Sequence, residues 1–183
     1  MRNFALLLFA LSITTLAMGM DQWIPSGAGL TNNRVNALAL NTKGHIFAGT
    51  DGGGLFVSKD DGNQWAPIGA GVMLPYITDI MIDENDYIYV ASQTLYFASE
   101  GGLFRSMDDG VEWTKLDVGY IVSAIGVNHS GDIYAGIVDP TDGSSSLIIS
   151  SDAGNSWYAS PFSVQSISTI GFGFVTVSSL KRV

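Results

Sequence analysis

Short hydrophobic runs, separated by turn-forming residues, recur along this chain. Residues 35–40, 77–82 and 122–127 are apolar on both faces and contain β-branched residues, and a fourth run of this kind starts at Val164. Each of the first three is followed by a turn of Asn, Asp, Gly or Ser residues and then by a second apolar run. Runs of this length bounded by turn residues indicate β-strands buried between neighbours. The pattern therefore predicts a chain built of strands.

The strands group into a unit that repeats about every 45 residues. We name the four strands of each unit A to D in chain order, strand A being the run described above. Strand B is expected at 45–49, 87–91 and 132–136, and strand C at 55–57, 103–105 and 147–149. Strand D is expected at Trp65, Trp113 and Trp157, and Trp23 begins a strand D with no unit before it. A fourth unit contributes strands A and B at 164–170 and 172–177.

Strands C and D are joined by the most specific motif of the sequence, an S-x-D-x-G-x-x-W frame that occurs three times. Its residues are Ser58, Asp60, Gly62 and Trp65; Ser106, Asp108, Gly110 and Trp113; and Ser150, Asp152, Gly154 and Trp157. We expect the Ser and Asp side chains to accept backbone N–H bonds in a tight hairpin. The glycine should have a positive φ, and the tryptophan ring should be buried. The motif is thus interpreted as structural, with ligand contact as the alternative.

This frame resembles the Asp-box, or BNR repeat, of bacterial sialidases, sortilin-type receptors, xyloglucanases and photosystem II assembly factors. Residues 29–35 and 44–55 are also similar to the propeller repeats of bacterial two-component regulators. The resemblance implies an all-β propeller of four-stranded antiparallel blades, of which about 3.5 are present. Because propellers usually close with four to eight blades, we interpret the chain as a fragment of a larger propeller of about six to eight blades; a closed four-blade ring or an oligomer is the alternative. These families share blades rather than a chemistry.

The N-terminal segment, residues 1–19, has one charge at Arg2, then an apolar run at 4–11 and small residues. This arrangement predicts a secretory signal peptide, and hence a secreted, periplasmic or cell-surface protein. Residues 20–183 would form the partial propeller, with blade repeats starting near residues 35, 77, 122 and 164. A membrane anchor is the alternative, but the apolar run is short for about 30 Å of hydrocarbon, and polar Asp21 and Gln22 follow.

The composition narrows the choice of partners. Seventeen acidic against eight basic residues give a formal net charge of −9 at pH 7. Such a surface repels phosphate backbones, so no nucleic-acid partner is expected. The chain has no cysteine, which excludes a disulfide framework. Stability must therefore come from an apolar core, for which 46% hydrophobic residues are sufficient.

In an up-and-down blade, successive connections alternate between two faces. The A–B turns and the Asp-boxes therefore share one face, and the B–C and D–A connections share the other. The B–C loops vary most in length, and such variation over a repeated scaffold is typical of a binding face. The candidate binding residues on this face are Arg34, Asp51, Tyr76, Tyr96, Tyr120 and Asp139.

Catalytic chemistry has weaker support. Sialidases need a cluster of arginines, and Arg34, Arg105 and Arg182 are too scattered in the repeat to converge. An inverting hydrolase of the xyloglucanase type needs two carboxylates about 6.5–9.5 Å apart. Asp79 is a weak catalytic candidate, because its repeat partners on the innermost strand are alanines. The alternative for Asp79 is a polar group solvated by water in a central channel.

No metal site and no cofactor are expected, because His45 and His129 have no His or Cys companions at ligand spacing. We predict an exported, non-catalytic binding or scaffold module for a glycan or a protein at the cell surface. No stable membrane insertion is expected after signal cleavage. The alternatives are a fragment of a xyloglucanase-like glycoside hydrolase and an assembly factor similar to the photosystem II stability proteins.

Overall fold

The computed structural model describes residues 27–31, 34–70, 72, 74–93, 101–161, 167–171 and 174–177. Within these residues there are fourteen strands and no helix. The predicted signal peptide, the predicted strand at Trp23 and the candidate Tyr96 lie outside the described residues. In the described part of the chain, no helical segment has the length and apolar character needed to cross a membrane.

Twelve of the strands form three sheets of four, and the last two form a half sheet. The first sheet contains β1 (Val35–Leu40), β2 (Ile46–Thr50), β3 (Leu55–Ser58) and β4 (Ala66–Ile68). The second contains β5 (Tyr76–Ile82), β6 (Ile88–Gln93), β7 (Gly102–Ser106) and β8 (Thr114–Leu116). The third contains β9 (Ile121–Val127), β10 (Ile133–Val138), β11 (Ser145–Ser150) and β12 (Tyr158–Ala159). The half sheet pairs β13 (Ile167–Gly171) with β14 (Phe174–Val177).

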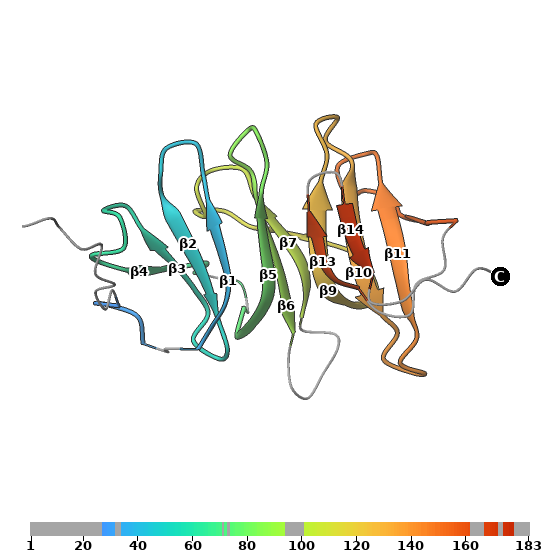
Figure 1. Ribbon diagram of the computed structural model, residues 1–183, viewed down its shortest axis with the longest axis horizontal. Helices are drawn as coiled ribbons and strands as arrows, with labels where there is room; N and C mark the ends of the chain where they lie inside the picture. The colour runs from blue at the N-terminus through green and yellow to red at the C-terminus, as the bar shows by residue number, and fades with distance from the viewer. Residues whose placement is uncertain are drawn as a thin grey trace, which may run out of the picture.

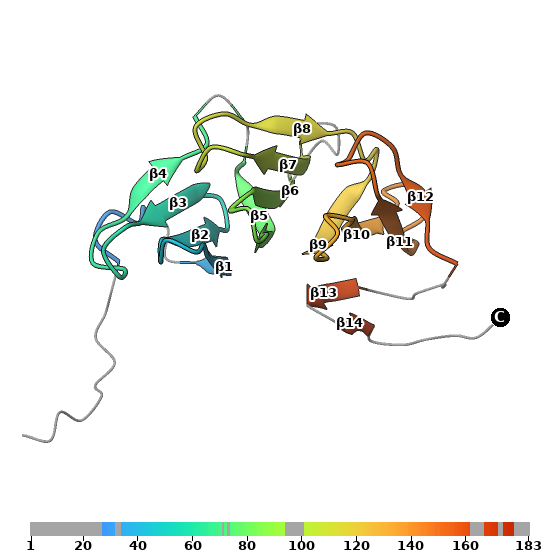
Figure 2. The ribbon, with the colours of Figure 1, turned by 90° about the horizontal axis from the view of Figure 1, so that it is seen from above.

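Strands follow chain order within each sheet, and neighbouring strands are antiparallel. Figure 1 shows the sheets standing side by side. Figure 2 shows them fanned along an open arc, with β1, β5, β9 and β13 on its inner side and β4, β8 and β12 on its outer side. These are the predicted blades, which we call blades 1 to 4 in chain order. Strand D differs in one detail, because in each blade it begins after the tryptophan.

The innermost strands share a β-bulge at the same place. The pairing skips Asn36 in β1, Thr78 in β5, Ser123 in β9 and Ser168 in β13. A bulge increases the local twist of a strand, which suits the narrow inner side of the arc. The fourth bulge gives Ile167 the register that Val35 has in β1, while the predicted start near Val164 lies outside the described residues.

The hydrophobic core lies between the blades. Ile77 and Ile80 of β5 are 0% and 6% exposed. They pack against blade 1, chiefly against Phe47, Leu55 and Val57. One blade further on, buried side chains of β9 pack in the same way against β6 and β7. Burying an aliphatic side chain completely contributes roughly 1.5–3 kcal/mol, so each blade is stabilised largely by its neighbours.

The three hairpins of the S-x-D-x-G-x-x-W frame, for which we keep the name Asp-box because of the resemblance, have the expected hydrogen bonds. In the first, Ser58 Oγ accepts the N–H of Gly62 at 2.8 Å and donates to Asp60 Oδ1 at 2.9 Å. The same carboxylate oxygen accepts the N–H of Gln64 at 2.8 Å. The other two boxes repeat this set of bonds. The N–H of Gln64, and after it the Ser58 hydroxyl, lower the pKa of Asp60 because they bind its charged form.

Two consecutive residues of each box have a positive φ. The glycine does so as predicted, with a φ of 85° at Gly62. The residue before it, which the sequence analysis did not single out, has a φ of 57° at Asp61, 58° at Asp109 and 60° at Ala153. Aspartate adopts this left-handed conformation more readily than alanine does, so the third box is the most strained of the three.

The box tryptophans are less buried than predicted. Trp65, Trp113 and Trp157 are all half-buried. Trp113 packs against the core between blades 1 and 2, and Trp157 against the core between blades 2 and 3. The indole N–H of Trp113 donates to the carbonyl oxygen of Gly110 at 3.0 Å. Each of these two rings therefore covers the junction with the preceding blade and keeps part of its surface in solvent.

Candidate binding face

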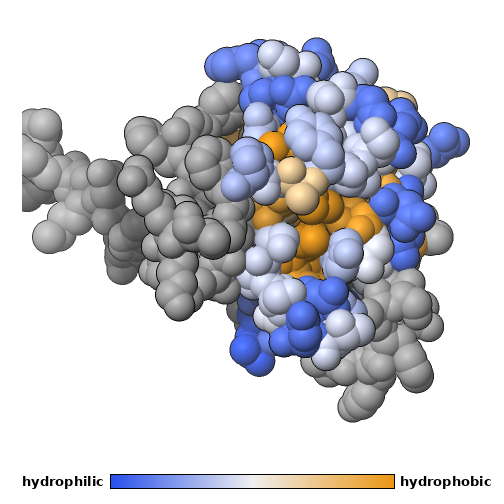
Figure 3. All heavy atoms as spheres, turned by 90° about the vertical axis from the view of Figure 1, so that its right-hand side faces the viewer, coloured by the Kyte–Doolittle hydropathy of each residue, from blue (hydrophilic) through white to orange (hydrophobic). Residues whose placement is uncertain are grey.

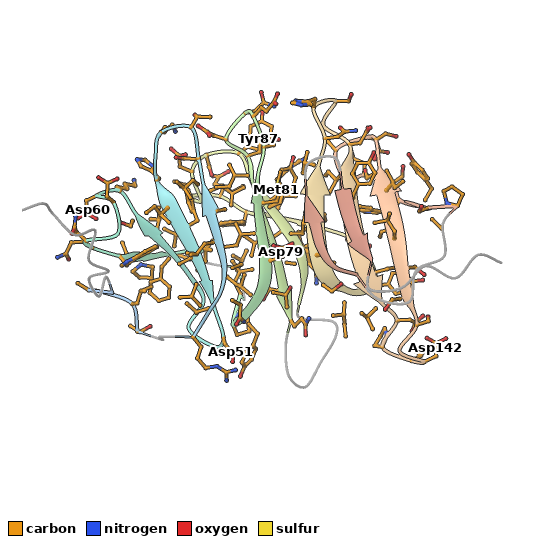
Figure 4. The ribbon with its side chains drawn as sticks, viewed as in Figure 1. Asp51, Asp60, Asp79, Met81, Tyr87 and Asp142 are labelled. Atoms are coloured by element: carbon orange, nitrogen blue, oxygen red, sulfur yellow. The ribbon has the colours of Figure 1, made fainter. Side chains whose placement is uncertain are left out.

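The connections between strands lie on two opposite faces, as the repeat predicts. In Figure 4, Asp60 of the first Asp-box and Tyr87, which follows an A–B turn, lie toward the upper side. Asp51 and Asp142, which belong to B–C connections, lie at the lower side. We call the upper side the box face and the lower side the loop face. The alternation of strand directions brings the D–A connections to the loop face as well.

Three of the predicted binding residues meet on the loop face where blades 1 and 2 adjoin. Arg34 Nη1 lies 2.7 Å from Asp51 Oδ2, and the N–H of Asp51 donates to the carbonyl oxygen of Arg34 at 2.9 Å. Asp51 also forms an isolated antiparallel bridge with Tyr76. The Arg34 side chain is 80% exposed. A surface ion pair of this kind contributes about 0–1 kcal/mol to stability, so its main effect is to present both charges at one point of the surface.

A hollow of about 330 Å³ lies on the loop face of blade 2, where the connection to blade 3 begins. It is lined by Gly101, Gly102 and the segment from Lys115 to Tyr120. Tyr120, another predicted binding residue, is 41% exposed there. A Cβ atom on Gly101 would lie 2.5 Å from the carbonyl oxygen of Ser92, so this position of the lining has room only for glycine. Lys115 and Asp117, which were not among the predicted binding residues, add charged groups to the lining.

The Asp139 carboxylate forms hydrogen bonds within its own loop. Its Oδ1 accepts the N–H of Thr141 at 2.8 Å and the Thr141 hydroxyl at 2.6 Å. Its backbone carbonyl accepts the N–H of Gly143 at 2.9 Å. The geometry therefore gives this carboxylate a role in shaping the B–C loop of blade 3, apart from both the Arg34 cluster and the hollow.

Asp79 joins two blades rather than standing free in a channel. It follows the bulge of β5, near the middle of the view in Figure 4. Its Oδ1 accepts the N–H of Ile80 at 2.9 Å, and its Oδ2 accepts the N–H of Ile125, on β9, at 2.8 Å. Burial raises the pKa of the carboxyl group, and the two N–H bonds oppose that rise. Both oxygens are engaged by backbone groups, so the geometry favours a structural role.

The bulge residues of the innermost strands form further links between blades. Asn36 Nδ2 donates to the carbonyl oxygen of Ile77 at 3.0 Å, and the Thr78 hydroxyl donates to that of Val122 at 3.1 Å. Each bond runs from strand A of one blade to the first part of strand A in the next. This function was not predicted from the sequence, although a polar residue at the second position of an otherwise apolar run signals it.

On the box face, neighbouring blades are joined through their A–B turns. Thr42 donates its N–H and its hydroxyl to Asp86 at 2.8 and 2.7 Å, and these bonds lower the pKa of the Asp86 carboxyl. His129 lies against Glu84 and forms an ion pair with it when the imidazole is protonated. Within the described ranges, no three His, Asp or Glu side chains converge so as to hold a metal ion. The polar groups of this face thus serve blade-to-blade contact.

No protein-family model and no curated protein sequence matches the chain. Solved structures do match. The extracellular domain of a hybrid two-component system from B. thetaiotaomicron has 16% identity and a TM-score of 0.56, over 75% of this chain and 18% of that one. The GH74 xyloglucanase from Xanthomonas campestris has 21% identity and a TM-score of 0.53, over 67% and 21%. YCF48 from Cyanidioschyzon merolae has 14% identity and a TM-score of 0.50, over 74% and 38%.

The chain has a β-propeller fold. Identities of this size establish the fold alone, and the chain spans about a fifth of the first two structures and less than half of the third. An arc of blades that covers a small part of its neighbours is consistent with a fragment of a larger propeller. In a propeller, adjoining blades bring their connections together at one end of the ring. This is why Arg34 and Asp51 of blade 1 meet Tyr76 of blade 2.

Proposed function

We propose that this propeller is an exported, non-catalytic module that binds a neutral glycan at the cell surface through its loop face. The observation that carries the proposal is the hollow on the loop face, whose lining includes aromatic Tyr120 and charged Lys115 and Asp117. The signal peptide expected at residues 1–19 supports export. A net charge of −9 favours a neutral ligand over a polyanionic one, because like charges repel.

The hollow has the size and lining of a site for a small polar ligand. Its volume of about 330 Å³ falls within the range of roughly 300–1,000 Å³ found for ligand pockets. The exposed ring of Tyr120 offers an apolar surface against which the C–H face of a sugar ring can pack, with its hydroxyl as a polar handle. Lys115 and Asp117 offer a donor and an acceptor to sugar hydroxyl groups.

A second contact region extends the site along the loop face. The Arg34–Asp51 pair and Tyr76 lie where blades 1 and 2 adjoin, and the hollow lies at the far end of blade 2, where the connection to blade 3 begins. Charged and aromatic side chains at both places suit a ligand with several sugar units, each making a modest contribution. We therefore expect an oligosaccharide to bind more tightly than a monosaccharide.

The proposal excludes turnover because of the environment of Asp79. A glycoside hydrolase needs two carboxyl groups flanking the scissile bond. Asp79 already accepts backbone N–H bonds at both oxygens, and one of these bonds holds two blades together. Neither oxygen is left to protonate a leaving group or to activate water without loss of a structural bond.

A glycan array, followed by calorimetric titration of the glycans that bind, tests the proposal. Tyr120→Ala should weaken binding about tenfold or more, the loss expected when an anchoring aromatic is removed. Tyr158→Ala is the matched control, because Tyr158 is 52% exposed on the outer strand β12 and lies outside the hollow. Equal loss in both variants would contradict the assignment of the site.

Assays of polysaccharide hydrolysis on the same preparation test the non-catalytic part. Release of product that is abolished by Asp79→Asn, with the fold retained by circular dichroism, would refute the proposal and favour a glycoside hydrolase. Absence of binding to every neutral glycan, together with capture of a surface protein that depends on Tyr120, would replace the glycan with a protein partner.

A further inference from the structure

The Asp117 carboxylate belongs to the lining of the hollow on the loop face. Asp117 is exposed and alternates with Leu116 and Val118, which are 5% and 8% exposed, so its side chain points away from the core. Within the part of the chain that the structure describes, this carboxylate forms no hydrogen bond and no ion pair. Both of its oxygens are therefore left to solvent or to a ligand.

Other aspartates of the blades show what these side chains do when they serve the fold. Asp60 accepts a backbone N–H within its Asp-box, and Asp139 accepts hydrogen bonds within its own loop. Asp86 binds Thr42 of the preceding blade. Each of these carboxylates holds a turn or joins two blades. Asp117 does neither, so the fold gives no reason for a carboxylate at its position.

Comparison of the repeats confirms that the blade does not need this group. Four positions after the box tryptophan, blade 1 has Gly69 and the third repeat has Pro161 where blade 2 has Asp117. The counterparts of Lys115 and Tyr120, which also line the hollow, are apolar as well: Pro67 and Ala159 for the first, and Val72 and Val164 for the second. Blade 2 therefore carries at this place polar and aromatic groups that the repeat does not require.

Hydrophilic side chains of the arc gather where its strands are connected. Figure 3 looks at the end of the arc formed by blade 3 and shows them at the upper and lower rims, toward the box face and the loop face, with apolar surface between them. A ligand rich in hydroxyl groups needs hydrogen-bonding partners, because an unpaired polar group is costly to bury. Such a ligand is therefore suited to the loop face rather than to the flank of a blade.

The chemistry of a carboxylate restricts what can bind to it. It accepts hydrogen bonds and donates none, and its two oxygens can receive two donors at once. In a neutral sugar the donors are hydroxyl groups. Two hydroxyl groups on adjacent ring carbons lie close enough together to reach both oxygens of one carboxylate. Hydrogen bonds to a charged acceptor are roughly twice as strong as those between neutral groups, so this pairing discriminates between sugars.

We propose that Asp117 is the specificity-determining residue of the hollow and selects sugar units that have two adjacent free hydroxyl groups. Such selection rests on the glycan-binding function proposed above, and it separates glycans by their linkage. A unit inside a 1,4-linked hexose chain keeps free hydroxyl groups on C2 and C3. A unit inside a 1,3-linked glucan is substituted at O3 and keeps no adjacent pair. Tyr120 packs against either sugar and contributes to affinity without selecting the linkage.

Biolayer interferometry on immobilised long-chain polysaccharides, in which chain ends are few, tests the proposal. The probes are a 1,4-linked glucan, a 1,4-linked mannan and a 1,3-linked glucan. We expect the wild type to bind a 1,4-linked polymer about tenfold or more tightly than the 1,3-linked one. Asp117→Asn should bring this ratio to about 1, because an amide has one acceptor oxygen in place of two. The matched control is Glu112→Gln, which also turns an exposed carboxylate into an amide, in an Asp-box on the opposite face.

Glu112→Gln should keep the preference for the 1,4-linked polymer. Two results would overturn the selection while leaving glycan binding in place. One is equal affinity of the wild type for 1,4-linked and 1,3-linked polymers, with both affinities reduced in Tyr120→Ala. The other is a preference for the 1,4-linked polymer that persists in Asp117→Asn. If none of the three polymers binds to the wild type, glycan binding by the loop face is itself refuted, and the selection by Asp117 with it.

Discussion

Replacing Gly154 with alanine tests how an Asp-box packs on the preceding blade. Gly154 has a φ of 88°, where alanine costs about 1–2 kcal/mol. A Cβ atom would also lie 2.8 Å from Cδ1 of Leu116 on β8. Leu116 is 5% exposed, so it has little room to move, and an extra methyl group in a packed site costs typically 1–3 kcal/mol. Alanine also lowers the conformational entropy of the unfolded chain, and this offsets the loss of stability by about 0.4–1 kcal/mol. We therefore expect Gly154→Ala to lower the free energy of unfolding by about 2–4 kcal/mol.

Gly131→Ala separates the cost of the positive φ from the cost of the contact with Leu116. Gly131 has nearly the same φ, 84°, but no atom lies within 4 Å of the added Cβ. Only the backbone cost applies, so we expect a loss of about 0.5–1.5 kcal/mol. Urea denaturation followed by tryptophan fluorescence measures both variants. Losses that agree within about 0.5 kcal/mol would refute the contact with Leu116. In a double-mutant cycle, Leu116→Ala should cost less in the Gly154→Ala background than in the wild type, because the clash is then absent.

Three further predictions follow from the boxes. Trp113→Ala should lower the free energy of unfolding by about 2–3 kcal/mol, less than the 3–5 kcal/mol of a fully buried ring, as judged by the urea midpoint. Ala153→Gly should raise it by about 0.5–1 kcal/mol, because glycine has no Cβ penalty at a φ of 60°; a lower melting temperature would contradict this. The Ser156 hydroxyl and N–H lower the pKa of Asp152 from 3.8 to about 2. The unfolded state then binds more protons, so stability should fall as the pH drops through this window, and Asp152→Asn should flatten that part of the stability profile.

The sequence by itself determined the strands and the Asp-box turns. The run at residues 35–40 is β1 (Val35–Leu40) without change, and the other predicted strands differ mainly at their ends. The bonds of an Asp-box connect residues no more than four positions apart, such as Ser58 to Gly62. Strands and turns of this kind depend on the pattern of apolar residues, on turn residues and on short-range hydrogen bonds. Residues close together in the sequence determine all three.

Only the tertiary structure decided what distant residues do to one another. Asp79, predicted to be catalytic or solvated in a channel, bonds to Ile125, which lies 46 positions away. The half-buried state of Trp113 and the meeting of Arg34 and Asp51 with Tyr76 also arise between blades. The angle and spacing at which blades stack result from many apolar contacts acting together, and no local pattern encodes that sum. For this reason the blades could be predicted from the sequence, whereas the surroundings of the residues at their junctions could not.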